Sequence, residues 1–263
     1  MGRLRGVNRP VAGRVGCRAV DTLPRRRILT WTAQAAVVAG AMALGIPATA
    51  AVAPGDPLAN GAAAGVPRRH VRDVLPAVST DAIALTIDDG PDPLWSPQVL
   101  DLLRRNRVRA TFSLVGKQVK AYPELVKRII AEGHSVCNHS MTHPQPFGAR
   151  SMTAIRQQIA DAQETIINAS GVTPRLFRAP GGDWRAGVLA AAASLRLVPL
   201  GWDVDPRDWS RPGSDTVTNR LLTARPGDIL LCHDGGGDRA QTLESLRNVL
   251  PALNRRGLQF VTL

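Results

Sequence analysis

The chain has 263 residues, which is long enough for one sizeable domain or two small ones. Its residues are 44% hydrophobic and 21% charged, a composition that excludes a disordered, collagen-like or multi-span membrane protein. Three cysteines are too few for a fold built on disulfides. The formal net charge is +12, but seven of these charges belong to the first fifty residues, which hold eight arginines and one acid, Asp21. The net positive charge of the chain therefore does not favour a nucleic-acid partner.

The first fifty residues have the order of a secretory signal peptide. Arg25, Arg26 and Arg27 precede a mild apolar run over 35–46, and small residues over 47–50 allow cleavage after Ala50. The apolar run is too short for a membrane-spanning helix, which needs roughly 17–25 residues. The paired arginines indicate a twin-arginine signal, and an ordinary secretory signal is the alternative. Residues 1–50 therefore predict a protein that is secreted or held in the cell wall or periplasm, with no membrane span after cleavage.

Residues 51–80 are predicted to be a linker or a loose amino-terminal arm, because four prolines and several glycines interrupt them. A single domain follows over residues 81–263, in which β-like runs alternate with helical patterns. The predicted strands span 83–87, 110–114, 135–138, 176–178, 197–202, 228–232 and 259–263. The predicted helices span 96–106, 118–132, 151–169, 185–195, 214–223 and 239–256. This alternation indicates an α/β fold with a parallel sheet or barrel, whose chemistry collects at the carboxyl ends of the strands.

Two adjacent acids, Asp88 and Asp89, follow the first predicted strand and precede Gly90 and Pro91. The turn that this Gly-Pro pair forces could bring both carboxylates into one pocket. One acid could then bind a cation while the other moves protons. Alone, the motif more often forms an ordinary turn.

His139 and His143 follow the third predicted strand. Two imidazoles four residues apart can converge on one metal if the segment turns helically, although surface and core histidines also occur at this spacing. The chain has only five histidines, and a third, His233, also ends a strand.

Arg178 ends a short apolar strand, and Gly181 and Gly182 follow it. The pattern indicates an anchored guanidinium beside backbone that is open to close approach, with a surface arginine in a β-to-α turn as the alternative. Further along the chain, three acids lie between Trp202 and Trp209. They could belong to a solvated loop or to a sugar-facing wall with carboxylates behind it.

The strand-end motifs together resemble those of the polysaccharide deacetylases, the NodB-homology proteins of carbohydrate esterase family 4. In chain order they are Asp-Asp-Gly, His-Ser-x-x-His, Arg-x-Pro-x-Gly, Asp-x-x-Asp-Trp and Leu-x-His. The resemblance covers about residues 81–263. It implies a distorted (β/α) barrel of about seven parallel strands, which agrees with the strands predicted from the pattern.

The resemblance also implies a divalent metal, most often zinc in this family, held by Asp89, His139 and His143. Two imidazoles and one carboxylate fit zinc and leave a position open for water and substrate. By the same resemblance, Asp88 would be the general base and His233 the general acid that protonates the leaving amine.

Two further side chains would support these groups. Arg178 would hold Asp88 in place, and Asp205 would orient and charge His233. Asp205 is preferred over Asp208 because it comes first in its motif.

The chain departs from the family pattern at two positions. Ile87 stands where Phe is usual, which changes only apolar packing. Gly181 stands where an aromatic residue is often found; its backbone N–H or that of a neighbour could still stabilise an oxyanion, but a side-chain contact with substrate is lost. Trp184 and Trp209, together with Trp202, are predicted sugar-stacking surfaces, and core packing is expected for at least one of them.

Cys137 and Cys232 lie on the metal-ligand strand and the His233 strand. A disulfide between them is possible outside the cell, and the sequence leaves their pairing open. Neither is predicted to bind the metal.

The predicted function is metal-dependent removal of N-acetyl groups from a polysaccharide that contains N-acetylglucosamine. Peptidoglycan is the first candidate substrate for an exported single-domain protein, chitin oligomers the second and acetylated xylan, an ester, the third. A non-catalytic carbohydrate-binding protein on the same fold is the alternative, and it predicts damage to at least one catalytic position. No such damage is found.

Overall fold

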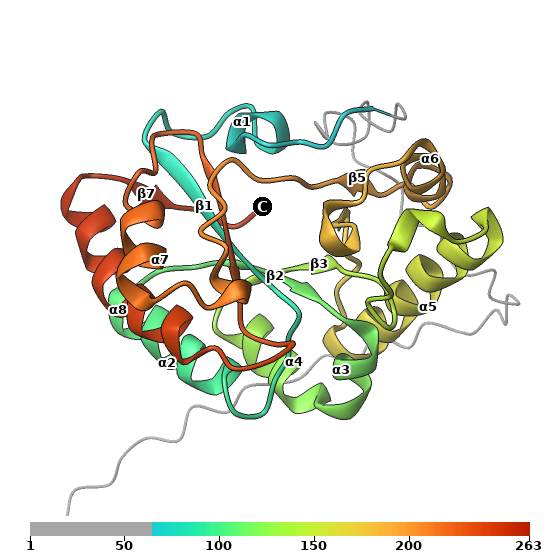
Figure 1. The fold of residues 1–263 in the computed structure, drawn as a ribbon, viewed down its shortest axis with the longest axis horizontal. Coiled ribbons are helices and arrows are strands. Elements are labelled where there is room, and N and C mark those ends of the chain that lie inside the picture. The colour runs from blue at the N-terminus through green and yellow to red at the C-terminus, as the bar shows by residue number, and fades with distance from the viewer. Residues whose placement is uncertain (1–64) are drawn as a thin grey trace, which may run out of the picture. The chain divides into compact units, whose positions relative to one another are not determined.

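The computed structural model describes residues 65–263, whose arrangement Figure 1 shows. The predicted signal peptide and residues 51–64 of the predicted linker lie outside the described residues. The strands are β1 (Ala82–Asp88), β2 (Thr111–Leu114), β3 (Ser135–Asn138), β4 (Leu176–Phe177), β5 (Val198–Pro199), β6 (Ile229–His233) and β7 (Gln259–Phe260). The α-helices are α1 (Val71–Val74), α2 (Ser96–Asn106), α3 (Gly116–Ala121), α4 (Pro123–Ala131), α5 (Met152–Ser170), α6 (Ala186–Ser194), α7 (Ser214–Leu221) and α8 (Ala240–Arg255).

The strands form one parallel sheet in the order β5-β4-β3-β2-β1-β6, and β7 pairs with the beginning of β1. β5 and β6 are the two edge strands of this order, and the irregular chain that follows β5 lies between them. Leu200 donates its N–H to the carbonyl of Phe177 on one side, and Val204 forms a parallel bridge with Leu230 on the other. The predicted distorted barrel is therefore confirmed, and one part of its wall is irregular chain.

Alternation along the strands separates two cores. Ile83, Leu85 and Ile87 of β1 belong to the largest apolar cluster, which α2, α4 and α8 cover from outside, whereas Ala82 and Ala84 face the other way. Every residue of β1 is buried, as expected for a strand of a parallel sheet with both faces covered. The helices lie around the strands in Figure 1, with α2, α7 and α8 on one side and α5 and α6 on the other.

The two cysteines do not pair. Both Cys137 and Cys232 are free and buried. Cys232 belongs to the cluster beneath the helices, and Cys137 belongs to the cluster on the opposite face of the strands. The alternation that turns His233 toward the barrel interior turns Cys232 outward, so a bridge between the two thiols is excluded.

Residues 65–80 differ from the prediction of a loose arm. Val71 and Val74 of α1 are fully buried in the second cluster, and Arg68 bridges Leu200 in parallel. Arg68 also accepts the N–H of Gly201 at its carbonyl. The prolines of this segment indicated a linker, but its two buried valines pack against the barrel. The domain therefore begins before residue 81.

A predicted helix over 118–132 is divided into α3 and α4 at Tyr122 and Pro123. Proline lacks the N–H that a continuous helix needs, and it drives the preceding residue out of the helical region. Tyr122 accordingly has φ −135° and ψ 58°. Among the described residues, none of the helices has the length and apolar character needed to cross a membrane.

Candidate active site

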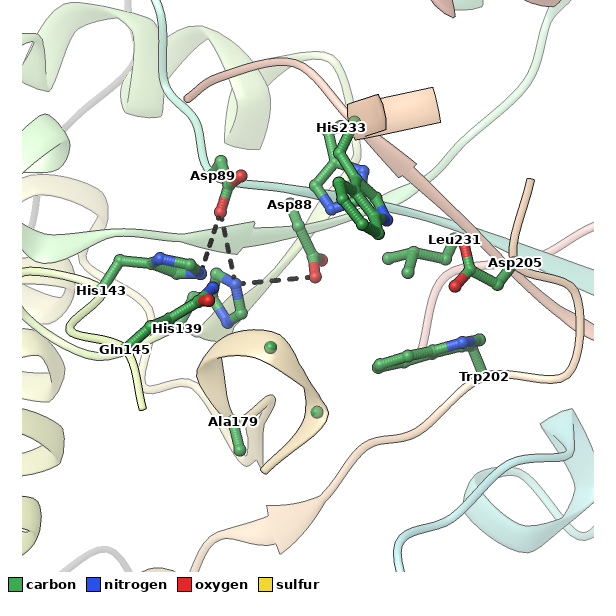
Figure 2. Close-up of a pocket in the computed structure, with 13 residues that line it drawn as sticks. Asp88, Asp89, His139, His143, Gln145, Ala179, Trp202, Asp205, Leu231 and His233 are labelled. Carbon is green, nitrogen blue, oxygen red and sulfur yellow. Dashed lines mark ion pairs between the residues drawn. The ribbon is translucent and has the colours of Figure 1, made fainter. Parts of the chain in front are cut away.

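A cavity of about 330 Å³ opens at the carboxyl ends of the strands (Figure 2). This is the end of a parallel barrel at which loops gather and ligands bind. Most of the predicted site residues line it, and the whole lining consists of Asp88, Asp89, His139, His143, Gln145, Ala179, Gly181, Gly182, Trp202, Asp205, Trp209, Leu231 and His233.

The predicted metal ligands meet on one side of this cavity. Oδ1 of Asp89 lies 3.4 Å from Nε2 of His139 and 3.4 Å from Nε2 of His143. The three donor atoms all lie within 4.8 Å of one another. Figure 2 shows both imidazoles directed at the Asp89 carboxylate, with Asp88 beside them. The expectation that these three side chains converge is confirmed as geometry.

Asp88 and Asp89 reach the same cavity because the strand ends between these two residues. Asp88 is the last residue of β1, and Asp89 adopts the left-handed region with φ 75°. Neighbouring residues of a regular strand would point to opposite faces, so this change of conformation is what turns the second carboxylate inward. A Cβ on Gly236 would lie 2.8 Å from Oδ2 of Asp89, so this glycine lets the loop after β6 pack against the carboxylate.

The two imidazoles converge through a bend, so the helical turn that the sequence analysis made a condition for convergence is not needed. Residues 139–143 contain no helix, and Ser140 and His143 have positive φ values of 67° and 52°. The side chain of Asn138 accepts the N–H of Ser140, and the Ser140 hydroxyl accepts the N–H of His143. These side-chain contacts replace the hydrogen bonds of a helical turn and hold both rings on one side.

The residues fit a divalent cation of the zinc type. Oδ1 of Asp89 is buried and has no hydrogen-bond partner among the described residues, although two imidazole nitrogens face it. Nδ1 of His139 lies 2.7 Å from the carbonyl oxygen of Arg178, which directs Nε2 of the ring toward Asp89. A carboxylate oxygen and two imidazole nitrogens form the donor set that a catalytic zinc site uses.

The charges in this cluster favour a cation. Burial acts to raise the pKa of Asp89, but the close contact with His139 and its charge outweigh burial, and the pKa lies well below its ordinary value. Burial acts to lower the pKa of His139, but the charges of Asp88 and Asp89 raise it overall. Burial and the neighbouring His139 lower the pKa of His143. The two carboxylates thus attract positive charge to the point where the donor atoms meet.

Arg178 holds Asp88 as predicted. Its fully buried guanidinium donates from one nitrogen to Oδ1 of Asp88 and to the hydroxyl of Thr86, both at 2.7 Å. Its other nitrogens donate to the carbonyls of Leu200 and Gly201 at 3.2 and 2.8 Å. All its contacts come from the wall of the barrel, so the Asp88 carboxylate has a fixed position at the cavity floor.

Asp208, and not Asp205, contacts His233, so the predicted assignment is wrong. Oδ1 of Asp208 lies 2.7 Å from Nδ1 of His233, and its Oδ2 accepts the N–H of His233 and the hydroxyl of Thr242. Asp205 instead accepts the N–H of Arg207 at the start of a tight turn. That turn carries Asp208 beneath the ring and leaves Asp205 at the cavity wall. The order of acids within the motif could not reveal it.

Burial and Asp208 act on His233 in opposite directions. Burial alone would lower the pKa of His233, but the hydrogen bond and charge of Asp208 raise it to about 9. The same contact holds the pKa of Asp208 below its ordinary value, against burial. His233 is therefore held as an imidazolium near neutral pH, with a proton that it can donate toward the cavity.

Two of the three predicted substrate-binding residues, Gly181 and Trp209, line the cavity. Gly181 lines the cavity with φ 64°, and among residues 65–263 its N–H has no hydrogen-bond acceptor. Trp209 also lines it and is 48% exposed. Trp184 does not line this cavity, and its half-buried ring packs edge-on against Phe177 at 6.1 Å. Such packing was expected for at least one of the three tryptophans.

Gln145 is a cavity residue that the sequence did not single out. Its side-chain amide carbon and nitrogen would each lie 3.4 Å from a Cβ placed on Gly181, and Figure 2 shows it beside the two imidazoles. An exposed glutamine in a loop has no periodicity or spacing that could have identified it.

Comparisons with known proteins agree with this geometry. The family model described as "Polysaccharide deacetylase" matches residues 76–200. A chitooligosaccharide deacetylase of Bradyrhizobium is 42% identical over 205 residues, which are 73% of this chain and 92% of the relative. A peptidoglycan-N-acetylglucosamine deacetylase of Bacillus cereus is 42% identical over 183 residues, covering 68% of this chain and 85% of the relative.

Solved structures lead to the same family. A crystal structure of a peptidoglycan N-acetylglucosamine deacetylase superposes with a TM-score of 0.67 and 34% identity, covering 70% of this chain and 87% of the other. The family 4 carbohydrate esterase from Streptomyces lividans, in complex with acetate, gives a TM-score of 0.64 and 31% identity over 69% of this chain and 91% of the other. With its fold, its strand-end motifs and these relatives in agreement, the chain belongs to the polysaccharide deacetylase family.

Proposed function

We propose that this protein is a metal-dependent deacetylase that hydrolyses N-acetyl groups on a polysaccharide containing N-acetylglucosamine, with peptidoglycan as its substrate. The observation that carries the proposal is the meeting of three sets of groups in one open cavity. They are the cation-binding cluster, the fixed Asp88 carboxylate and the His233–Asp208 pair. The names of the relatives, which include both peptidoglycan and chitooligosaccharide deacetylases, support the substrate class.

Asp89, His139 and His143 would hold the cation. A divalent metal bound there would polarise the acetyl carbonyl and lower the pKa of a water molecule toward 7. All the remaining steps belong to side chains and backbone of this chain.

Asp88 is placed to act as general base. Its Oδ1 accepts from Arg178, while its Oδ2 lies 3.6 Å from Nε2 of His139 and faces the cavity. Asp88 takes a proton from the attacking water as the water oxygen bonds to the carbonyl carbon. The fixed guanidinium keeps Asp88 from turning away, because it holds one carboxylate oxygen and leaves the other free.

The N–H of Gly181 is placed to stabilise the oxyanion. It lines the cavity and has no acceptor among the described residues, so it can donate to the oxygen that gains charge when the tetrahedral intermediate forms. A backbone donor needs no side chain, which is why glycine at this position keeps the function.

His233 is placed to complete the reaction as general acid. Its raised pKa keeps the ring protonated, and it gives its proton to the leaving nitrogen as the carbon–nitrogen bond breaks. The products are acetate and the free amine of the sugar. Asp208 stabilises the imidazolium and fixes the ring orientation through Nδ1.

Acetate release by the purified full chain tests the proposal. Peptidoglycan, chitin oligosaccharides and acetylated xylan are supplied side by side, with zinc present. The proposal expects the fastest release from peptidoglycan. Faster release from chitin oligosaccharides would keep the reaction and change the substrate, and release from xylan alone would make the protein an esterase. Binding of the polymers without release from any of them would favour the carbohydrate-binding alternative.

We also propose that residues 1–50 direct export through the twin-arginine route. The support is the order of basic, apolar and small residues in the sequence. Replacing Arg25 and Arg26 with lysine should retain the protein in the cytoplasmic fraction. If the lysine variant is exported as well as the wild type, the route is that of an ordinary secretory signal.

A further inference from the structure

A second, smaller hollow adjoins the active-site cavity. It measures about 110 Å³ and is lined by Arg69, Gly182, Trp184, Gly201 and Trp202. Gly182 and Trp202 line both hollows, so a polymer that fills the larger one can continue into the smaller. A chain of sugars needs such a neighbouring position, because only one sugar at a time can present its acetyl group to the cation-binding cluster.

The amino-terminal segment supplies the charged group of this hollow. Arg68 accepts the N–H of Gly201 at 2.7 Å and donates its own N–H to Pro199 at 2.8 Å, which fixes the backbone at Arg69. A Cβ on Gly201 would lie 3.0 Å from Cγ of Arg69, so the arginine stem rests against the Gly201 backbone. These backbone hydrogen bonds and this contact fix the position of Arg69 beside the hollow.

The guanidinium of Arg69 is available to a ligand. Among residues 65–263 its side chain makes no hydrogen bond or ion pair. Burial raises the pKa of Asp203 overall, although the charge of Arg69 acts to lower it. The carboxylate of Asp73, in the first turn of α1, accepts the backbone N–H groups of Arg69 and His70 and not the guanidinium. A planar guanidinium with free donors matches the geometry of a carboxylate.

Two tryptophans give the hollow an apolar wall. Trp184 is held edge-on by Phe177, and Trp202 lies with its ring centroid 5.6 Å from the guanidinium carbon of the buried Arg178. Both rings are partly exposed, and a Cβ on Gly182 would lie 2.8 Å from the Trp202 ring, so this glycine leaves room for it. Rigid aromatic surfaces of this kind can pack against the apolar face of a sugar ring.

We propose that this hollow binds the sugar next to the one that is deacetylated, and that Arg69 binds a carboxylate carried on that sugar. The inference rests on the proposed deacetylase function and deepens it, because it gives the site a preference for acidic over neutral glycans. A neutral oligosaccharide would gain the contacts with the tryptophans alone. A glycan with a carboxylate on alternate sugars would gain those contacts and a charge-assisted hydrogen bond.

Kinetics of Arg69→Gln on three glycans test this inference. The first is peptidoglycan strand stripped of peptide, which has free lactyl carboxylates. The second is the same strand with its carboxylates converted to methyl amides, and the third is a chitin oligosaccharide of equal length. Since an exposed charge pair contributes up to about 1 kcal/mol, we expect KM to rise about fivefold on the first substrate only, with kcat unchanged.

Arg72→Gln is the matched control, because Arg72 lies on α1, is exposed and lines neither hollow. It should leave all three KM values unchanged, and Arg69→Lys should recover part of the loss. An equal change in KM for the charged and neutralised strands, or no change for either, would overturn the inference.

Calorimetric binding of the stripped strand separates this inference from the proposed function. Arg69→Gln should weaken binding about fivefold even if the wild type released no acetate from any substrate. If the wild type released no acetate but still bound the stripped strand more tightly than Arg69→Gln, only the deacetylase proposal would be contradicted. Normal acetate release with no binding difference would contradict the role of Arg69 alone.

Discussion

The floor and the rim of the cavity are built differently. The floor residues Asp88, His139, Arg178 and Asp208 are at most 3% exposed, and each is held by contacts from neighbouring strands or loops. At the rim, Trp209 is 48% exposed and Gln145 is exposed, and so is Arg69 in the adjoining hollow. Under the proposed function, this difference assigns the chemistry to buried groups in fixed positions and the choice of polymer to exposed groups.

The largest expected effects come from two floor residues that should fail in different ways. Asp88→Asn should keep the cation and lose about 10²–10⁴-fold in turnover, because the amide cannot take a proton from water. His139→Ala should lose both the cation and turnover, because it removes one of three ligands. Metal content and acetate release are measured on the same samples. Full activity of Asp88→Asn would show that another group is the base.

Arg178→Lys should show that the floor also stabilises the fold. Lysine cannot reach the Asp88 carboxylate, the Thr86 hydroxyl and two carbonyls at once, so buried acceptors lose their donors. We expect the free energy of unfolding in urea to fall by about 3 kcal/mol. An unchanged urea midpoint would mean that the network can rearrange and that the floor is less rigid than described.

Asp208→Asn should lower turnover about 10–100-fold and change its pH dependence. The general acid must be protonated, so wild-type turnover should fall as the pH rises past the His233 pKa of about 9. The variant loses the charge that raises this pKa while burial still lowers it, so the alkaline limb should move to lower pH. A pH–rate profile measures the shift.

Asp205→Asn is the matched control for this prediction, since Asp205 lines the cavity but has no contact with His233. Its alkaline limb should coincide with that of the wild type. A shift in Asp205→Asn and none in Asp208→Asn would restore the assignment that the structure rejects.

Trp209→Ala should have the smallest effect and should act at the rim alone. The ring is half-exposed and contacts Arg207, so its loss should leave the urea midpoint almost unchanged. We expect KM for the polymer to rise a few-fold, about 1 kcal/mol of lost ring contact, with kcat retained. A large fall in kcat would show that the rim positions the reacting group as well.

The sequence predicted the floor better than the rim, for a physical reason. Asp88 and His233 end buried strands, and Asp89 and His139 come directly after them. Because parallel strands end at one edge of the sheet, the order of motifs was enough to predict that these residues meet. Asp208 was missed because a tight turn, which no periodicity reports, decides which of two nearby acids lies beneath the ring.

Trp209 was predicted at the rim, but Arg69 and Gln145 were not, because their positions depend on packing between distant segments. The segment that carries Arg69 resembles a linker in the sequence, and only its pairing with Leu200 and Gly201 places it beside the smaller hollow. Gln145 is an exposed residue of a loop outside the helices and strands, and it lines the cavity. Trp184 has the same residue type as Trp209, and its packing against Phe177 holds it at the smaller hollow and away from the active-site cavity.

Restoration of activity by added metal is the most direct test of the proposed metal-dependent deacetylation. The full chain is treated with a chelator, its metal content is measured, and acetate release from peptidoglycan is followed before and after zinc is added. We expect one tightly bound cation per chain, loss of acetate release when it is removed, and recovery when zinc is returned. Acetate release that persists in the metal-free protein, or a chain that binds no metal at this site, would contradict the proposal.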